Sequence, residues 1–85
     1  MKIICNEEVE DMMETYMGEV ITVWCANYIY TGVLKAIGKE SITLTKASVV
    51  YETGVLTDKN WKDSQPLPYD WSIMKNAIES YGKMK

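Results

Sequence analysis

Few residues in this chain have side chains suited to catalytic chemistry. The sequence contains no histidine, so no Cys–His or Ser–His pair can activate a nucleophile. Its two cysteines, Cys5 and Cys25, do not have the spacing of metal ligands, and no glycine-rich loop of the kind that cradles phosphates is present. We therefore expect no enzyme, no metal site and no cofactor, and we interpret both cysteines as free, buried thiols.

The charged residues suggest at most weak binding to nucleic acid. Residues 1–19 contain six acidic residues and one lysine, a net charge of −5, whereas residues 20–85 contain eight lysines and six acidic residues, a net charge of +2; together they give the formal net charge of −3. None of the basic residues is arginine, so the chain lacks the side chain that clamps phosphates with two hydrogen bonds. Any binding to RNA should therefore depend on local lysines.

The length and hydropathy of the chain predict a single, small domain. A chain of 85 residues buries only about 60 to 65% of its unfolded surface, so its monomer should be marginally stable and assembly is a natural remedy. No apolar run approaches the length of a membrane span, and the segment MKIIC meets an acidic run before it can resemble a secretory signal. We expect a cytoplasmic protein that does not bind membranes.

An amphipathic helix is predicted at the N-terminal end. Asn6 is a good N-cap, and Gly18 suits the position that follows the last turn of a helix. Between them, apolar residues recur at helical spacing, at Val9, Met12, Met13, Tyr16 and Met17. We favour the interpretation in which this stripe covers the core of its own domain; the alternative is a docking surface for a partner protein.

Three strands in a meander are predicted after Gly18, where the apolar period changes from 3.6 to 2. Gly32, inside the second of these strands, marks a bend or a close approach of two backbones. The third strand should shift its phase near Lys46 and Ala47. The three strands cover residues 19–27, 28–37 and 41–52.

The C-terminal part of the chain is predicted to hold two more strands. A turn-rich loop over residues 53–68, which contains Trp61, leads into them. The strands cover residues 69–75 and 77–81 and meet at Asn76. The last residues, GKMK, are expected to be a frayed tail.

This layout, an N-terminal α-helix followed by a five-stranded, strongly bent antiparallel sheet, resembles the Sm-like family of Sm, LSm and Hfq-type proteins, whose fold is an SH3-like barrel. The first Sm motif is similar to YTGVL, residues 30–34, followed by SITLTKASVV, residues 41–50. The second motif is similar to MKNAI, residues 74–78. The resemblance implies a mainly β fold divided into an amphipathic helix (1–18), a barrel (19–81) and a tail (82–85).

The resemblance also implies an assembly. In Sm-like proteins the fourth strand of one copy pairs with the fifth strand of the next, and this head-to-tail contact closes into a ring. Gly32 would then permit the sharp bend that lets the second strand serve both halves of the barrel. We therefore expect a homo-oligomeric ring.

Two sites for single-stranded RNA are implied by the resemblance. The first lies at the pore, in the loops after the second and fourth strands, which here contain Lys39, Ser41, Lys75 and Asn76. Lysines repeated around a pore would build a positive field that holds phosphates. The second lies on the opposite face, where bases would stack on Trp24 and Tyr28.

Each of these sites has an alternative interpretation. The lysines can be ordinary solvated loop residues, and Trp24 can pack against a loop or a neighbouring subunit, which is the interpretation we favour for it. Two functions therefore remain open. One is a ring that binds single-stranded RNA weakly, ranked first because of the family resemblance; the other is a structural or adaptor oligomer that binds protein partners through the N-terminal helix or the Trp61 loop.

Overall fold

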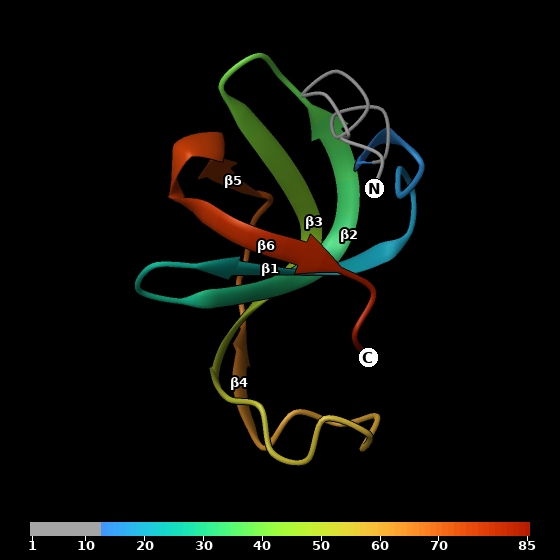
Figure 1. The fold of residues 1–85 in the computed structure, drawn as a ribbon, viewed down its shortest axis with the longest axis vertical. Helices are drawn as coiled ribbons and strands as arrows, with labels where there is room; N and C mark the ends of the chain where they lie inside the picture. The colour runs from blue at the N-terminus through green and yellow to red at the C-terminus, as the bar shows by residue number, and fades with distance from the viewer. Residues whose placement is uncertain (1–12) are drawn as a thin grey trace, which may run out of the picture.

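The computed structural model describes residues 13–85 and shows a mainly β protein (Figure 1). Its six strands are β1 (Val20–Cys25), β2 (Ile29–Ile37), β3 (Ser41–Glu52), β4 (Asp63–Pro66), β5 (Trp71–Met74) and β6 (Ile78–Gly82). A short 3-10 helix, η1 (Lys75–Ala77), joins the last two strands. The strands form one sheet in the order β4-β3-β2-β1-β6, and β5 also pairs with β3. The sheet is not closed, because β5 and β6 are not paired with each other.

The predicted meander is confirmed, since β1, β2 and β3 pair in sequence as antiparallel neighbours. The two predicted C-terminal strands are also present, as β5 and β6. The prediction of five strands is nevertheless one strand short, because the structure has six. The additional strand, β4, lies in the segment predicted as a turn-rich loop, and all four of its residues are exposed.

The sequence DSQP carries no alternation of apolar residues, and its proline is unusual in a strand except at an edge. The segment becomes a strand because the end of β3 extends past β5 and offers it a free backbone edge, with Val49 opposite Gln65 and Val50 opposite Ser64.

The predicted N-terminal helix is not supported in the described residues. Only Met13 and Glu14 have helical conformation there, and the following residues form turns. In this segment, Tyr16 N–H donates a backbone hydrogen bond to Met13 O, and Met17 N–H donates one to Glu14 O. Each bond joins residues three apart, which is the tighter spacing of a 3-10 turn and not that of an α-helix. The remainder of the predicted helix, with Asn6, lies outside the described residues. Among residues 13–85, no helix is both long and apolar enough to cross a membrane.

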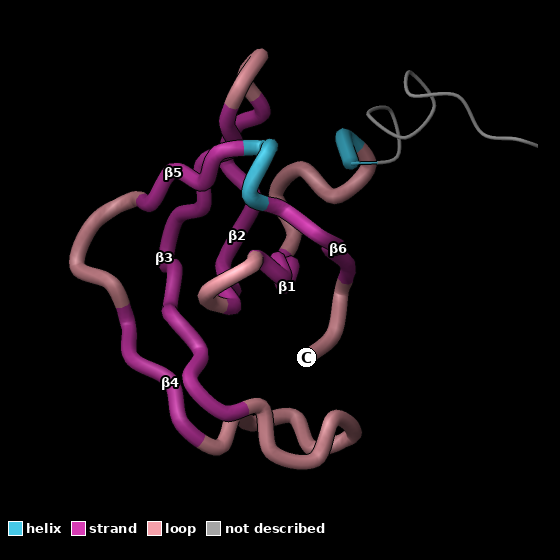
Figure 2. The backbone as a smooth tube through the Cα atoms, turned by 60° about the vertical axis from the view of Figure 1, so that its left-hand side comes forward, coloured by secondary structure: helices cyan, strands magenta, loops and turns pink. Residues whose placement is uncertain are grey.

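The longest strand, β3, is the centre of the fold. It pairs with β2 along nearly its whole length, with β5 through its first part and with β4 through its last part. Figures 1 and 2 show β5 and β4 beside different stretches of β3, which curls together with β2. One strand can serve two partners in this way only if the sheet bends strongly.

The predicted phase shift in β3 is also confirmed. Opposite Thr31 and Val33, β3 contains one extra residue, so its register with β2 changes there. Lys46 takes up the extra length with a positive φ of 51°. Before this bulge the buried residues of β3 are Ile42 and Leu44, and after it they include Ala47 and Val49. The bulge thus keeps apolar side chains on the inner face while the strand turns.

Gly32 lies opposite this bulge, where the backbones of β2 and β3 come close together. A Cβ atom at position 32 would lie 2.9 Å from Ala47 Cα and 3.0 Å from Thr45 O. Both are backbone atoms, so they cannot move aside as the end of a side chain can. The position therefore requires glycine. Gly32 was predicted to mark a bend or a close approach of two backbones, and the structure shows the close approach.

The core lies inside the curve of the sheet. Its fully buried apolar side chains come from β1, β2 and β3, and Met13 and Ile73 close it at the sides. The largest are Ile21, Val23, Leu34, Ile42 and Leu44. Cys25, predicted to be a buried thiol, is half-buried and packs against this cluster.

We predict that Gly32→Ala lowers the free energy of unfolding by about 1–3 kcal/mol, because the added methyl group overpacks a backbone contact. Gly82→Ala is the matched control, since a Cβ atom there meets nothing within 4 Å. Urea denaturation followed by tryptophan fluorescence measures both. Equal stability of the two variants would show that the contact at Gly32 is not tight.

Candidate nucleic-acid interface

The structure brings the predicted pore residues together at one end of the sheet. Ser41 begins β3 directly after the β2–β3 turn and pairs with Met74, the last residue of β5. The Lys75 N–H then donates a 2.8 Å hydrogen bond to Glu40 O. This contact joins η1 to the β2–β3 turn and gathers the four predicted side chains, which are Lys39, Ser41, Lys75 and Asn76.

The lysines of this cluster are available for binding as far as the described residues are concerned. Lys39 is exposed and Lys75 is half-buried. Within residues 13–85, ion pairs are made by other lysines and not by these two. Glu40 lies beside Lys39 in the chain, however, and Glu79 lines the same hollow as Lys75. One copy of the cluster therefore presents little net positive charge.

Lys75 borders an apolar hollow of about 430 Å³. Its lining includes Met13, Ile37, Ile78 and Tyr81, so the lysine can bury its aliphatic stem while its ammonium group reaches solvent. The hollow runs along β6, which pairs only with β1 among the described strands. An apolar side chain would fit this hollow better than a phosphate would.

The second predicted site lies at the other end of β2. Tyr28 is 51% exposed and Trp24 is half-buried, and both line an open hollow of about 330 Å³ around the β1–β2 turn. The structure therefore places these two residues together, at the opposite end of β2 from Lys39. Tyr28 also shares a second hollow, of about 200 Å³, with Met74 and Ala77, which flank Lys75 and Asn76.

The sequence reasoning missed a set of aromatic residues next to Tyr28. They gather around a small hollow of about 140 Å³ and include Tyr30, Tyr51 and Trp71. The rings of Tyr28 and Tyr30 are 6.4 Å apart and tilted by 57°, a geometry that aromatic pairs favour. Tyr28 and Tyr30 lie two residues apart, a spacing that places them on one face, but Trp71 joins them only through the pairing of β5 with β3.

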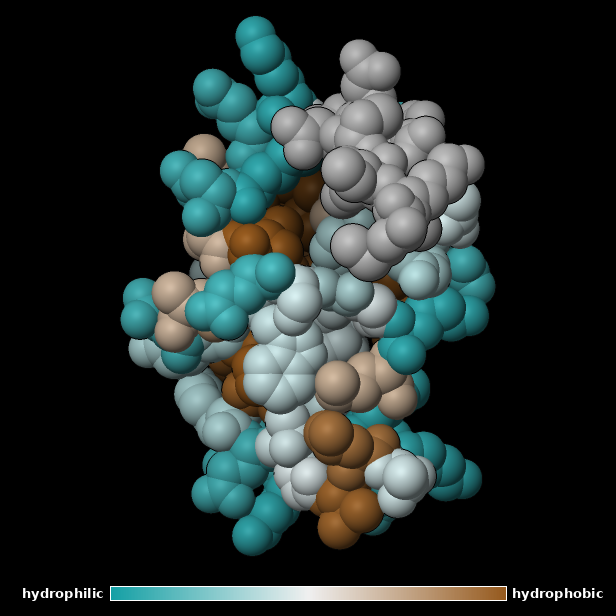
Figure 3. Space-filling view, viewed as in Figure 1, coloured by the Kyte–Doolittle hydropathy of each residue, from teal (hydrophilic) through white to brown (hydrophobic). Residues whose placement is uncertain are grey.

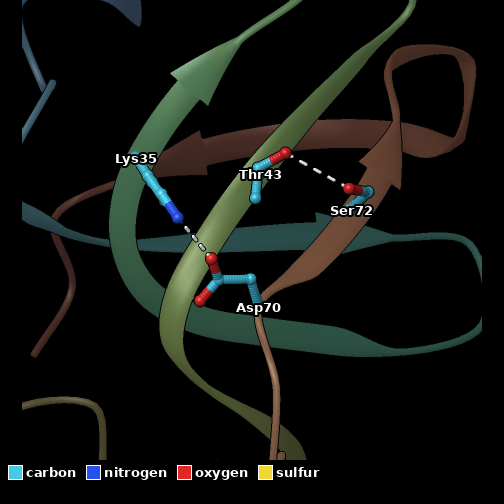
Figure 4. Close-up of polar contacts among 4 residues, drawn as sticks. All are labelled: Lys35, Thr43, Asp70 and Ser72. Carbon is cyan, nitrogen blue, oxygen red and sulfur yellow. Dashed lines mark hydrogen bonds and ion pairs between the residues drawn. The ribbon is translucent and has the colours of Figure 1, made fainter.

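Polar contacts hold β5 in this position (Figure 4). Asp70 precedes β5, and its carboxylate accepts a 2.6 Å hydrogen bond from Lys35 Nζ of β2. Within β5, the hydroxyl of Ser72 lies 3.2 Å from that of Thr43. The hydrogen bond from Lys35, followed by one from Thr45, lowers the pKa of the Asp70 carboxyl group. The ionised carboxylate therefore links the start of β5 to β2, a strand with which β5 does not pair.

Cys25 is the one cysteine among residues 13–85. Burial and, second, the Glu79 carboxylate raise the pKa of the Cys25 thiol, so the free thiol is a poor nucleophile at neutral pH. Cys5 lies outside the described residues. Within residues 13–85, no three side chains of His, Cys, Asp or Glu come together as metal ligands.

We predict that Asp70→Asn destabilises the protein at pH 7 and that the difference from the unchanged chain disappears in acid. The pKa of Asp70 is lower in the folded state, so its contribution is present above the unfolded value of about 3.8 and is lost as the pH falls through the folded value. The urea midpoint at pH 7 and at pH 2.5 measures it. Asp63→Asn in β4 is the control, and a difference for Asp70→Asn that persists at low pH would contradict the ionic contact.

Comparisons with known proteins do not assign the chain to a family. No protein-family model matches the sequence, and no curated protein has significant similarity to it. The function must therefore be argued from the geometry of the interface.

Proposed function

We propose that this chain is an Sm-like protein that assembles into a homo-oligomeric ring and binds single-stranded RNA weakly through Lys39 and Lys75. The order of elements supports the family, since a meander of three strands is followed, after β4, by two short strands joined by a single 3-10 helix. The bend at Gly32 is of the kind that the resemblance implies for the second strand.

The observation that carries the proposal is the hydrogen bond between Lys75 N–H and Glu40 O. It connects the two loops that, by the resemblance, would face the pore. The pairing of Ser41 with Met74 already brings the two segments together, and this hydrogen bond extends the contact to Lys75 and to the neighbour of Lys39. With it, Lys39 and Lys75 form a pair whose backbone positions are fixed relative to each other, as a site repeated in each copy requires.

Two of the open edges of the sheet, those of β5 and β6, support the ring. In the described part of the chain, β5 pairs only with β3 and β6 only with β1. The β5 edge exposes apolar surface, with Trp71 40% and Met74 50% exposed. The β6 edge borders the apolar hollow of about 430 Å³. One edge thus has projecting apolar side chains and the other a hollow, which suits a head-to-tail contact between copies.

A ring would compensate for the weak charge of one copy. Each copy contributes two lysines, and their repetition around a pore raises the local potential although the chain is acidic overall. Binding of this kind releases counterions, so it should weaken steeply as salt increases. It should also show little preference among bases, because the β2–β3 turn offers no aromatic or amide side chain.

We predict that the double variant Lys39→Ala/Lys75→Ala binds oligo-U and oligo-A at least about tenfold more weakly than the unchanged chain at low salt, because each copy loses both phosphate contacts. Fluorescence anisotropy at two salt concentrations measures the affinity and its salt dependence.

The matched control is Lys59→Ala/Lys62→Ala, which removes two exposed lysines from the β3–β4 loop. An equal loss in this control would show that only total charge matters. A loss with Tyr28→Ala alone would instead place the RNA on the opposite face, where bases would stack.

An adaptor function is the second candidate, and exposed apolar residues of the β3–β4 loop favour it. Val55 is 70% exposed and Leu56 is 51% exposed. Figure 3 shows hydrophobic side chains at the lower end of the molecule, where this loop lies. No binding of either oligonucleotide at low salt would reject RNA binding and leave this function.

A further inference from the structure

The β3–β4 loop encloses the ammonium group of Lys85. Lys85 Nζ donates hydrogen bonds of 2.6 Å to Thr53 O, 3.1 Å to Val55 O and 2.9 Å to Asn60 O. It also lies 4.5 Å from the centre of the Trp61 ring. The tail is therefore anchored, and the prediction of a frayed tail is wrong.

These contacts match the chemistry of a primary ammonium group. Such a group has three N–H donors and no acceptor, and here three backbone carbonyl groups accept them. The face of an indole ring attracts a cation at this distance. Among residues 13–85, Lys85 has no ion-pair partner, so carbonyl dipoles and the ring, rather than a carboxylate, recognise the charge.

The loop keeps its shape through contacts of its own. Asp58 N–H donates to Val55 O, and Asn60 N–H donates to the Asp58 carboxylate at 3.0 Å. Gly54 has a positive φ of 69°, which turns the chain between two of the accepting carbonyl groups. An ion pair of 3.3 Å between Lys62 and Glu52 closes the base of the loop. The carbonyl groups therefore converge through the fold of the loop as well as through Lys85.

We propose that loop residues 53–61 are a binding site for primary ammonium groups, which Lys85 occupies within the same chain. The site accepts a primary alkylammonium group from another molecule when Lys85 leaves it. Three converging acceptors select against a quaternary ammonium group, which has no N–H donor. This proposal does not depend on RNA binding or on a ring.

Occupation of the site also positions the segment that follows β6. Lys83 pairs with Glu19 at 2.8 Å, and Lys85 lies in the loop, so the segment is fixed at two points. Between them, Met84 lines a hollow of about 340 Å³ together with Trp24. Release of Lys85 would therefore change the surroundings of Trp24.

The test uses the full chain with Lys85→Ala and n-butylammonium chloride as the ligand. In two-dimensional ¹H–¹⁵N NMR spectra, the substitution should shift the Trp61 indole signal and the amide signals of residues 54–60. Butylammonium should return these signals toward their original positions in a saturable manner. The unchanged chain, whose site is filled, should not respond at the same concentrations.

Three controls make the result specific. Tetramethylammonium chloride and 1-butanol should not restore the signals, because the first lacks N–H donors and the second lacks charge. Lys83→Ala should leave the loop signals in place, although it removes a lysine from the same segment. Lys85→Met should shift the loop signals, and butylammonium should not restore them, because the methionine side chain still fills the space beside Trp61.

The proposal is overturned if Lys85→Ala and Lys85→Met both leave the loop signals unchanged. It is also overturned if butylammonium has no effect on Lys85→Ala, or if tetramethylammonium or butanol acts equally well. Should Lys85→Ala fail to fold, the loop signals of Lys85→Met alone decide whether the loop depends on the ammonium group.

Discussion

The close approach of β2 and β3 at Gly32 and Ala47 is the constraint on which the rest of the structure depends. A Cβ atom has no room between these backbones, and the bulge at Lys46 adds the residue that lets β3 turn at the same place. Because of this bend, β3 can pair with β5 in its first part and β4 in its last part. A straight β3 would leave the core open on one side.

The same bend determines what the surface can do. It brings η1 against the β2–β3 turn, where Lys75 bonds to Glu40, and so creates the pair of lysines on which the proposed RNA site rests. It also leaves β5 and β6 each paired on one side within the described part of the chain. The proposed site and the open edges of β5 and β6 therefore both depend on this bend, and the contact between Lys35 and Asp70 holds β5 in addition.

The sequence predicted what depends on local pattern and missed what depends on distant contacts. Alternating apolar residues located the meander. The close approach at Gly32 could be predicted from a glycine inside a strand, and the bulge at Lys46 from a change in the phase of that alternation. The strand β4 was missed because a free edge of β3, rather than its own residues, makes it a strand. The anchored tail and the aromatic set around Tyr28 were missed for the same reason, since Lys85 and Trp71 find their neighbours only in the folded chain.

The most direct test of the central claim, that the bend leaves two complementary edges for neighbouring copies, is the mass of the particle in solution. Multi-angle light scattering of the full chain should give one discrete mass that is a whole-number multiple, greater than one, of 9.7 kDa, maintained as the protein is diluted. A mass that equals a single chain at every concentration would contradict the account, because the edges of β5 and β6 would then remain unpaired.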